Sequence, residues 1–322
     1  TNGDICGDLF IDCTGFKSLL LGEHFKVGFK SCKDVLFVDQ ALAIHVPYES
    51  EDAPIASHTI STGQSAGWVW DIGLQNRRGV GHVYSSAHTT EEQASEELLN
   101  YIAQTGGHVN EADIRKIPLN PGHRVKFWHQ NCVAIGLSAG FLEPLEASSL
   151  LLVEISASMI ADQFPATRDA MEIVAQRFNR TFLYRWDRII DFLKLHYMLS
   201  KRNDSAFWID NRDSASIPQS LQDQLTLWQY QPPWHNDFEH AIEVFPAASY
   251  QYVLYGMGFD TQPSALGMSE VYKQKASSLR QKNTQQIQQM LKTLPSNRAL
   301  INKIHQYGLQ KCKLFQSDMT PR

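Results

Sequence analysis

The segment from Cys132 to Leu150 constrains the fold of this 322-residue chain more than any other. It runs from an apolar stretch through the sequence Gly136-Leu-Ser-Ala-Gly140 and two glutamates around a proline into a second apolar stretch. Glycine lets the main chain approach a ligand closely because it carries no Cβ, and the free N–H groups at a helix start attract negative charge. The segment therefore predicts a buried strand, a tight turn and a helix that begins beside an anionic ligand.

Strand signals dominate the part of the chain before this segment. Runs rich in β-branched and aromatic residues, bounded by turn residues, recur there and are typical of strands. An acidic start after Thr90, followed by apolar residues with helical spacing as far as Thr105, predicts one amphipathic helix. The expected strands cover residues 8–13, 35–46, 57–62, 66–74, 79–86, 123–129 and 132–136.

After Ala147 the spacing of apolar residues becomes helical. Apolar and aromatic residues advance by three or four from Met171 to Tyr197, which predicts one long helix with a broad apolar face. We therefore divide the chain into a mixed α/β part, residues 1–165, and a mostly helical part, residues 166–322. The other expected helices begin near residue 146 or cover residues 217–230, 237–245, 249–256, 268–293 and 297–308.

Composition narrows the class of protein. A net charge of −5 argues against general nucleic-acid binding. No apolar run reaches the roughly 18 residues of a membrane span, and there is no signal peptide. The five cysteines and twelve histidines lack the spacing of a metal site or a disulfide framework. We expect a soluble cytoplasmic protein with no metal site and with no membrane or nucleic-acid partner.

One interpretation of the glycine-rich turn is a serine hydrolase. The residues around Ser138 match the G-x-S-x-G nucleophile elbow, and Asp191 and His196 or His235 follow in the order that such hydrolases use. In an elbow the helix begins directly after the serine, whereas residues 141–144 intervene here. The hydrolase is therefore the weaker of the two interpretations of this turn, the other being close approach of the main chain to a ligand.

Two further patterns are compatible with an aromatic ligand. Glu143 and Glu146 flank Pro144, where they either cap the start of a helix or lie against a bound cofactor. Trp68 and Trp70 alternate along a predicted strand, so both indoles share one face, either as core packing or as the wall of an aromatic site. The chain has no G-x-G-x-x-G after a strand and no Walker sequence, so it does not encode a complete nucleotide site.

Several local motifs occur together in a fixed order. They are Asp8-Leu-Phe-Ile-Asp-Cys-Thr-Gly-Phe16, Gly67-Trp-Val-Trp-Asp-Ile-Gly73, Arg77-Arg78-Gly79 with Val83-Tyr-Ser-Ser86, the segment from Cys132 to Leu150, and Asp191-Phe-Leu-Lys-Leu-His-Tyr197 with Phe207-Trp208. In this order they resemble the flavin-dependent halogenases, the tryptophan halogenase family, along most of the chain.

The resemblance implies an α/β fold, the later part of an FAD-binding domain of the glutathione-reductase-like, p-hydroxybenzoate-hydroxylase-like type, with a mostly helical region on the substrate side. It implies an FAD-dependent oxidoreductase that halogenates an electron-rich aromatic substrate, tryptophan or a similar indole. In this family a separate flavin reductase supplies reduced FAD. Oxygen and a halide ion, chloride or bromide, then give a flavin hydroperoxide and hypohalous acid. The reductase is a transient partner, and a homodimer is left open.

The resemblance also implies roles for individual residues. Glu146 matches the catalytic glutamate, which can orient the halogenating species or take the ring proton. The backbone amides of Ser148 and Ser149 match the halide site. The residues matched to the wall between flavin and substrate are Trp68, Trp70 and Ile72. The residues matched to FAD contacts are Asp12, Gly15, Gly136, Gly140, Phe141 and Pro144.

The chain departs from the family pattern in three places. Gly73 stands where the family has a proline, and Ala147 and Ser149 replace a serine and a glycine beside the halide site. The glycine-rich FAD motif and the catalytic lysine are expected before Thr1, so this chain alone is expected to be incomplete. A flavin monooxygenase that does not halogenate, and a flavin-fold protein without catalysis, remain alternatives.

Overall fold

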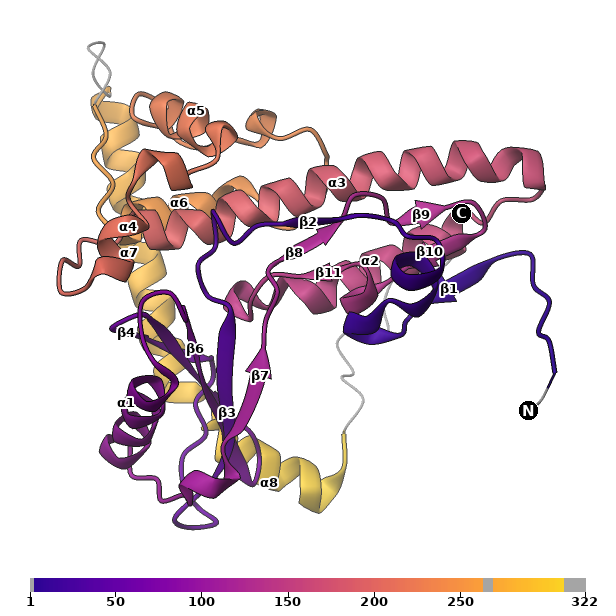
Figure 1. Cartoon of the computed structure of the whole chain (residues 1–322). Helices are drawn as coiled ribbons and strands as arrows, with labels where there is room; N and C mark the ends of the chain where they lie inside the picture. Colours follow the sequence, from indigo (N-terminus) through magenta and orange to yellow (C-terminus); the bar gives the residue numbers. More distant parts are fainter. Residues whose placement is uncertain (1–2, 263–268, 310–322) are drawn as a thin grey trace.

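The computed structural model describes residues 3–262 and 269–309 of the chain. In Figure 1 the strands belong to the first half of the chain and the long helices to the second, as the spacing of apolar residues predicts. No helix in these two ranges is long and apolar enough to cross a membrane. Some predicted positions lie outside the described residues. They are residues 1–2 of the predicted α/β part, residues 263–268 and 310–322 of the predicted helical part, and with them the first residue of the predicted helix 268–293.

The largest sheet has five antiparallel strands in the order β4-β5-β6-β3-β7. Helix α1 (Glu91–Gln104) covers one face of this sheet, where Val69 and Val80 share a cluster of buried side chains with Leu98. In chain order the strands are β3 (Gln40–Pro47), β4 (Ile60–Gln64), β5 (Gly67–Gly73), β6 (Arg77–Tyr84) and β7 (Arg115–Pro118).

The two tryptophans of β5 lie on the opposite face of this sheet, as the alternation along the strand predicts. Trp68 belongs to the main hydrophobic cluster, and Trp70 packs against that cluster. Gly81 is the register partner of Trp70, and a Cβ at Gly81 would come within 2.1 Å of the indole ring. This register therefore requires glycine on the neighbouring strand.

Two small sheets hold the glycine-rich segment. One has the order β1-β10-β9, with β1 (Phe10–Asp12) parallel to β10 (Cys132–Ala134) and β9 (Trp128–His129) antiparallel to it. The other has the order β11-β8-β2, formed by β11 (Gly140–Phe141), β8 (Gly122–Arg124) and β2 (Phe29–Ser31). The segment thus passes from a buried parallel strand in one sheet to an edge strand in the other.

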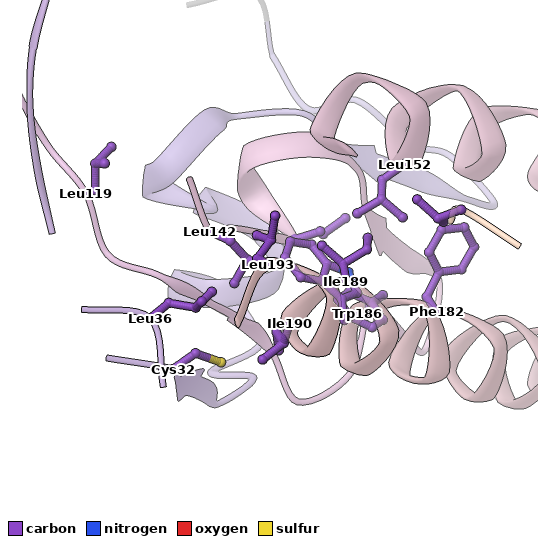
Figure 2. Close-up of a cluster of buried hydrophobic side chains, with 14 of the residues drawn as sticks. Cys32, Leu36, Leu119, Leu142, Leu152, Phe182, Trp186, Ile189, Ile190 and Leu193 are labelled. Atoms are coloured by element: carbon purple, nitrogen blue, oxygen red, sulfur yellow. The ribbon is translucent and has the colours of Figure 1, made fainter. Parts of the chain in front are cut away.

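The helical half is built around the 31-residue helix α3 (Arg168–Met198). Its side chains Phe182, Trp186, Ile189 and Leu193 point into one buried cluster, which Leu152 of α2 also enters (Figure 2). Residues from both predicted parts of the chain share this cluster, and the boundary at residues 165 and 166 stays a prediction. The other helices are α2 (Ser148–Asp162), α4 (Ala206–Asp210), α5 (Gln219–Trp228), α6 (Ala247–Gly256), α7 (Glu270–Thr293) and α8 (Asn297–Tyr307).

Several predicted elements are wrong in whole or in part. The strand predicted for residues 123–129 is divided into the short strands β8 and β9. The predicted helix 237–245 is absent, because the backbone N–H groups of Glu239 and His240 donate to the Tyr184 hydroxyl and the Glu243 carboxylate and not to carbonyls within a helix. The strand predicted from residue 35 begins only at residue 40, because the N–H groups of residues 35 and 36 close a turn on the carbonyl of Cys32.

Candidate active site

The turn between β11 and α2 places two glutamates in different environments. Leu145–Ala147 forms a single 3₁₀ turn, in which Glu146 has φ = 63° and Ala147 has φ = 49°. Both values lie in the left-handed region that residues other than glycine rarely adopt, and such strain concentrates at functional sites. The turn leaves Glu146 exposed, whereas only 1% of Glu143 is exposed.

Glu146 meets a histidine of the long helix α3. Its Oε1 lies 3.1 Å from Nε2 of His196, and Nδ1 of the same ring lies 2.8 Å from the carbonyl oxygen of Phe192, one helical turn earlier. The hydrogen bond with His196 lowers the pKa of Glu146; partial burial opposes this effect, and the charge of His196 adds to it. Glu146 is therefore an ionised and oriented carboxylate at neutral pH.

Glu143 is held inside the core by two donors from different elements. Its Oε2 accepts hydrogen bonds from Nε1 of Trp68 at 3.1 Å and from the hydroxyl of Tyr197 at 2.6 Å. Its Oε1 has no hydrogen-bond partner among the described residues. Burial raises the pKa of Glu143, although both hydrogen bonds and the charge of His196 act in the opposite direction. Glu143 therefore connects its turn to β5 and to α3 by hydrogen bonds.

The residues predicted to form a wall beside the flavin, Trp68, Trp70 and Ile72, lie on β5, and Trp68 contacts the turn through Glu143. Trp68 is buried and donates to Glu143, and the ring of Trp70 lies 6.4 Å from that of Trp68 at an angle of 64°. Ile72, at the end of the same strand, is 41% exposed. The predicted wall therefore grades from a buried, hydrogen-bonded indole to an exposed aliphatic side chain, and its role beside a ligand stays a prediction.

The loop after β1 is organised by one buried carboxylate. Oδ2 of Asp12 accepts the backbone N–H groups of Leu20 at 3.1 Å and Leu21 at 2.8 Å, and Oδ1 accepts the N–H and hydroxyl groups of Thr14. Burial raises the pKa of Asp12, but the hydrogen bonds from Thr14, Leu21 and Leu20 outweigh burial and the pKa is lowered. Gly15 follows with φ = 70° and with nothing within 4 Å of the position of a Cβ, so space is open beside this loop.

A cavity of about 410 Å³ lies between this loop and the glycine-rich turn. Phe16, Phe29 and Phe141 give it aromatic walls, Arg124 contributes a guanidinium group, and Gly140 lines it as well. A Cβ at Gly140 would come within 2.5 Å of a carbonyl oxygen of β8, so strand pairing alone requires this glycine. The cavity suits a flat ring that carries a negatively charged group.

A second cavity of about 260 Å³ lies on the other side of the glycine-rich turn, against α2 and α3. Gly136, Leu137, Ser149 and Trp186 are among its mostly apolar lining residues. Gly136 has φ = 68°, a left-handed value that favours glycine. Pro144 precedes the 3₁₀ turn Leu145–Ala147 and is not among the lining residues of either cavity.

The start of α2 has no side-chain cap. Its first residue, Ser148, is buried, and no side chain caps the helix, whose N-cap position is Ala147. The first N–H groups of a helix have no carbonyl partner within it and carry a partial positive charge. The backbone around Ser148 and Ser149 therefore has the electrostatics of an anion site.

Ser138 does not form a hydrolase site in this structure. Its hydroxyl is buried and donates to the carbonyl oxygens of Asp12 and of Ile135, the latter at 2.9 Å. It makes no hydrogen bond to any described histidine, and His196 is bonded to Glu146 and Phe192 instead. Within the described residues Ser138 therefore lacks the paired base that a nucleophilic serine requires.

A family model for tryptophan halogenase matches residues 1–271 of the chain. The chain belongs to the tryptophan halogenase family. A crystal structure of a tryptophan halogenase from Shewanella frigidimarina superposes with a TM-score of 0.91, is 50% identical, and covers 97% of this chain and 59% of that one. A flavin-dependent tryptophan C-6 halogenase from taromycin biosynthesis superposes with a TM-score of 0.85 at 31% identity, covering 94% and 60% of the two chains.

Tryptophan 6-halogenase of Streptomyces toxytricini is 35% identical to this halogenase-family chain over 257 residues, which are 80% of this chain and 48% of that protein. The chain therefore spans about half the length of the curated relatives it matches. The structural neighbours are flavin-dependent halogenases, which confirms the predicted FAD-binding fold with a helical C-terminal region.

Sequence reasoning missed three residues of this site. It placed Glu143 near the turn without a role and considered His196 only as a hydrolase base, and it quoted Tyr197 only within a motif. The signal available was the position of Tyr197 on the apolar face of the predicted long helix, with His196 directly beside it. Adjacent residues of one helix thus hold the two glutamates of one turn.

Proposed function

We propose that this chain provides the catalytic glutamate, the halide loop and the substrate-side helices of an FAD-dependent enzyme that halogenates tryptophan or a related indole. The observation that carries the proposal is Glu146, an exposed carboxylate in a strained turn, oriented by His196 and followed by an uncapped helix start. The solved structures similar to this chain include a flavin-dependent tryptophan halogenase, which supports the substrate class.

The cavity between the Asp12 loop and the glycine-rich turn fits part of FAD. Its phenylalanine walls can pack on a flat ring, and Arg124 can pair with a negative group. We assign Gly140 and Phe141 to this contact, because both line the cavity. Asp12 acts indirectly, since its carboxylate already accepts hydrogen bonds from its own loop. The other residues assigned to the flavin side are Gly15, Gly136 and Pro144.

Reduced FAD, when bound, supplies with oxygen the oxidising power that turns a halide into an electrophile, and a separate flavin reductase supplies the reduced form. The chain's own contribution to the halide is the start of α2, where the amides of Ser148 and Ser149 can donate to an anion. Ser149 also lines the smaller, mostly apolar cavity.

Glu146 then acts on the substrate. When an electrophilic halogen bonds to an indole carbon, that carbon still carries its hydrogen, and loss of this proton restores the aromatic ring. Such a ring cation is a far stronger acid than a carboxylic acid, so a carboxylate with a lowered pKa is a sufficient base. Trp68 donates to Glu143 of this turn, and we propose that Trp68, Trp70 and Ile72 separate the flavin side from the substrate side.

The test uses the whole protein with a flavin reductase, FAD, bromide or chloride, and tryptophan, with products analysed by mass spectrometry. We expect a mono-halogenated product, and we expect Glu146→Gln to abolish most of it. Glu154→Gln, on the exposed side of α2, is the matched control and is expected to retain activity. A hydroxylated product without halogenation would favour the monooxygenase alternative, and full activity of Glu146→Gln would remove Glu146 from the mechanism.

A further inference from the structure

The ring of His196 is in contact with two groups that both accept hydrogen bonds. Nδ1 lies 2.8 Å from the carbonyl oxygen of Phe192, which has no proton to give, so Nδ1 carries a hydrogen. In a neutral ring Nε2 then has only a lone pair, and it lies 3.1 Å from Oε1 of Glu146. Two lone pairs at that distance repel each other, so this contact requires one proton between Nε2 and Oε1.

The position of that proton follows from the surroundings of the two groups. Glu146 has the more exposed side chain, 39% against 22% for His196, so its charged form keeps more contact with water. Among the described residues, the charge of His196 also acts on Glu143 of the same turn, whose carboxylate oxygen is bound by Tyr197. The contact between Nε2 and Oε1 is therefore best met with the proton on the ring and the negative charge on the more exposed carboxylate.

We propose that His196 is the positioning residue of Glu146: as an imidazolium it binds Oε1 and leaves Oε2 free to take the substrate proton. This inference rests on the proposed function for its catalytic meaning. Oε2 of Glu146 makes no hydrogen bond among the residues that the structure describes. The contact also ties the strained turn to α3, because Nδ1 anchors the ring to the Phe192 carbonyl on the same helix.

The contact with His196 explains why the Glu146 carboxylate keeps one orientation. Glu146 and Ala147 are in left-handed conformations without the freedom of glycine, so the turn needs outside contacts to persist. The His196 contact provides one at the side chain of Glu146, and the His196 ring is itself packed edge-to-face with Phe192, with ring centroids 4.9 Å apart. Removal of the ring frees both the carboxylate and the turn.

The first experiment does not need activity. The whole protein is labelled with ¹⁵N-histidine, and the His196 ring signals, identified by their loss in His196→Gln, are recorded at pH 7. We expect an imidazolium in the unmodified protein and a neutral ring protonated at Nδ1 in Glu146→Gln. His58→Gln, at an exposed histidine, is the control and is expected to leave these signals unchanged. A neutral His196 ring in the unmodified protein overturns the inference.

The second experiment measures halogenation by the whole protein with FAD, reductase and halide. His196→Phe removes both the contact and the charge, and we expect kcat to fall about 100-fold, the order of loss for a misplaced catalytic group, with little change in KM for tryptophan. His196→Gln keeps an N–H donor for Glu146 and is expected to recover part of kcat. Because the hydrogen bond with His196 lowers the pKa of Glu146, its loss in His196→Phe should move the acidic limb of the pH profile of kcat to higher pH.

The two experiments separate the possible failures. If the unmodified protein halogenates and both His196 variants keep its kcat and pH profile, the positioning role is wrong while the proposed function stands. If the unmodified protein does not halogenate tryptophan, the proposed function is wrong, and the ring signals still decide whether the shared proton exists. Circular dichroism melting curves that match the unmodified protein show that a loss in kcat does not come from unfolding.

Discussion

Glu143 and Glu146 lie three residues apart in one turn, yet their surroundings shift their pKa values in opposite directions. Glu143 is enclosed in the core, where burial raises its pKa. Glu146 is exposed, and a hydrogen bond with His196 lowers its pKa. Helix α3 contributes to both environments, because His196 and Tyr197 are consecutive residues of that helix. Identical side chains in a single turn thus have different surroundings, a buried one for Glu143 and an exposed one for Glu146, which we propose to be the reactive group.

The comparison also shows how the strain of the turn is supported. The Glu143 side is fixed by donors from β5 and α3, which are parts of the main core. The Glu146 side has left-handed backbone and an exposed carboxylate, which core packing alone does not hold. We interpret Glu143 as the residue that anchors the turn to the core, and Glu146 is the residue that we propose to be catalytic. Each of the following changes affects one side more than the other.

The largest expected effect concerns Glu146 and activity. Glu146→Gln keeps the shape of the side chain but removes the base, so we expect kcat to fall by about 10²- to 10⁴-fold, the usual contribution of a general base. The free energy of unfolding should change by no more than about 0.5 kcal/mol, as for a surface position. Steady-state kinetics and urea denaturation of the same preparation measure both quantities. A large loss of stability with normal kinetics would reverse the roles given to the two glutamates.

Glu143→Ala should show the opposite pattern, with a large effect on stability. The substitution leaves the indole N–H of Trp68 and the hydroxyl of Tyr197 buried without an acceptor, and each such donor costs about 1–3 kcal/mol. We therefore expect the free energy of unfolding to fall by about 4 kcal/mol in total, measured by urea denaturation followed by circular dichroism. Glu154→Ala, exposed on α2, is the control. A loss as small as in that control would show that Glu143 does not anchor the turn.

Tyr197→Phe is a smaller change on the same side of the turn. It removes one donor to Glu143 and keeps the aromatic ring and the hydrogen bond from Trp68, so the free energy of unfolding should fall by about 1–2 kcal/mol. Tyr272→Phe, at a tyrosine that is 65% exposed on α7, should leave it unchanged. The two variants are compared by urea denaturation at one pH, and equal stabilities would mean that the hydroxyl of Tyr197 contributes nothing to the anchor.

The sequence predicts the elements around this turn better than the contacts within it. The spacing of apolar residues located α1 and α3 closely, and the alternation in β5 placed both indoles on one face. These features depend on neighbours within a few residues. The contact of Glu146 with His196 joins positions 50 residues apart, and no local pattern encodes it. The same holds for the burial of Glu143, since its donors lie on β5 and α3.

The backbone conformation of this turn could also not be predicted from the sequence. A helix was expected from about Glu146, but the left-handed residues Glu146 and Ala147 delay it to Ser148. Neither residue is a glycine or an asparagine, so composition gives no warning of this conformation. The absent helix at 237–245 has a different cause, because the side chains of Tyr184 on α3 and of nearby Glu243 accept N–H groups that a helix would use.

The smallest expected effect is also the most direct comparison, since the two glutamates should give opposite pH signatures. The raised pKa of Glu143 means that its contribution to stability is full below its ordinary value of 4.5 and is lost as pH rises through the raised value. The lowered pKa of Glu146 means that its contribution is present above 4.5 and is lost as pH falls through the lowered value.

The measurement is the free energy of unfolding of the unmodified protein minus that of each glutamine variant, from urea titrations between acidic and neutral pH. Subtraction removes the other groups that titrate in this range, among them Asp191, whose pKa burial raises to about 6. For Glu143→Gln we expect the difference to decrease as pH rises, and for Glu146→Gln to decrease as pH falls below 4.5. Slopes of the same sign would mean that the two carboxyl groups do not differ in this way and would contradict the distinction drawn between Glu143 and Glu146.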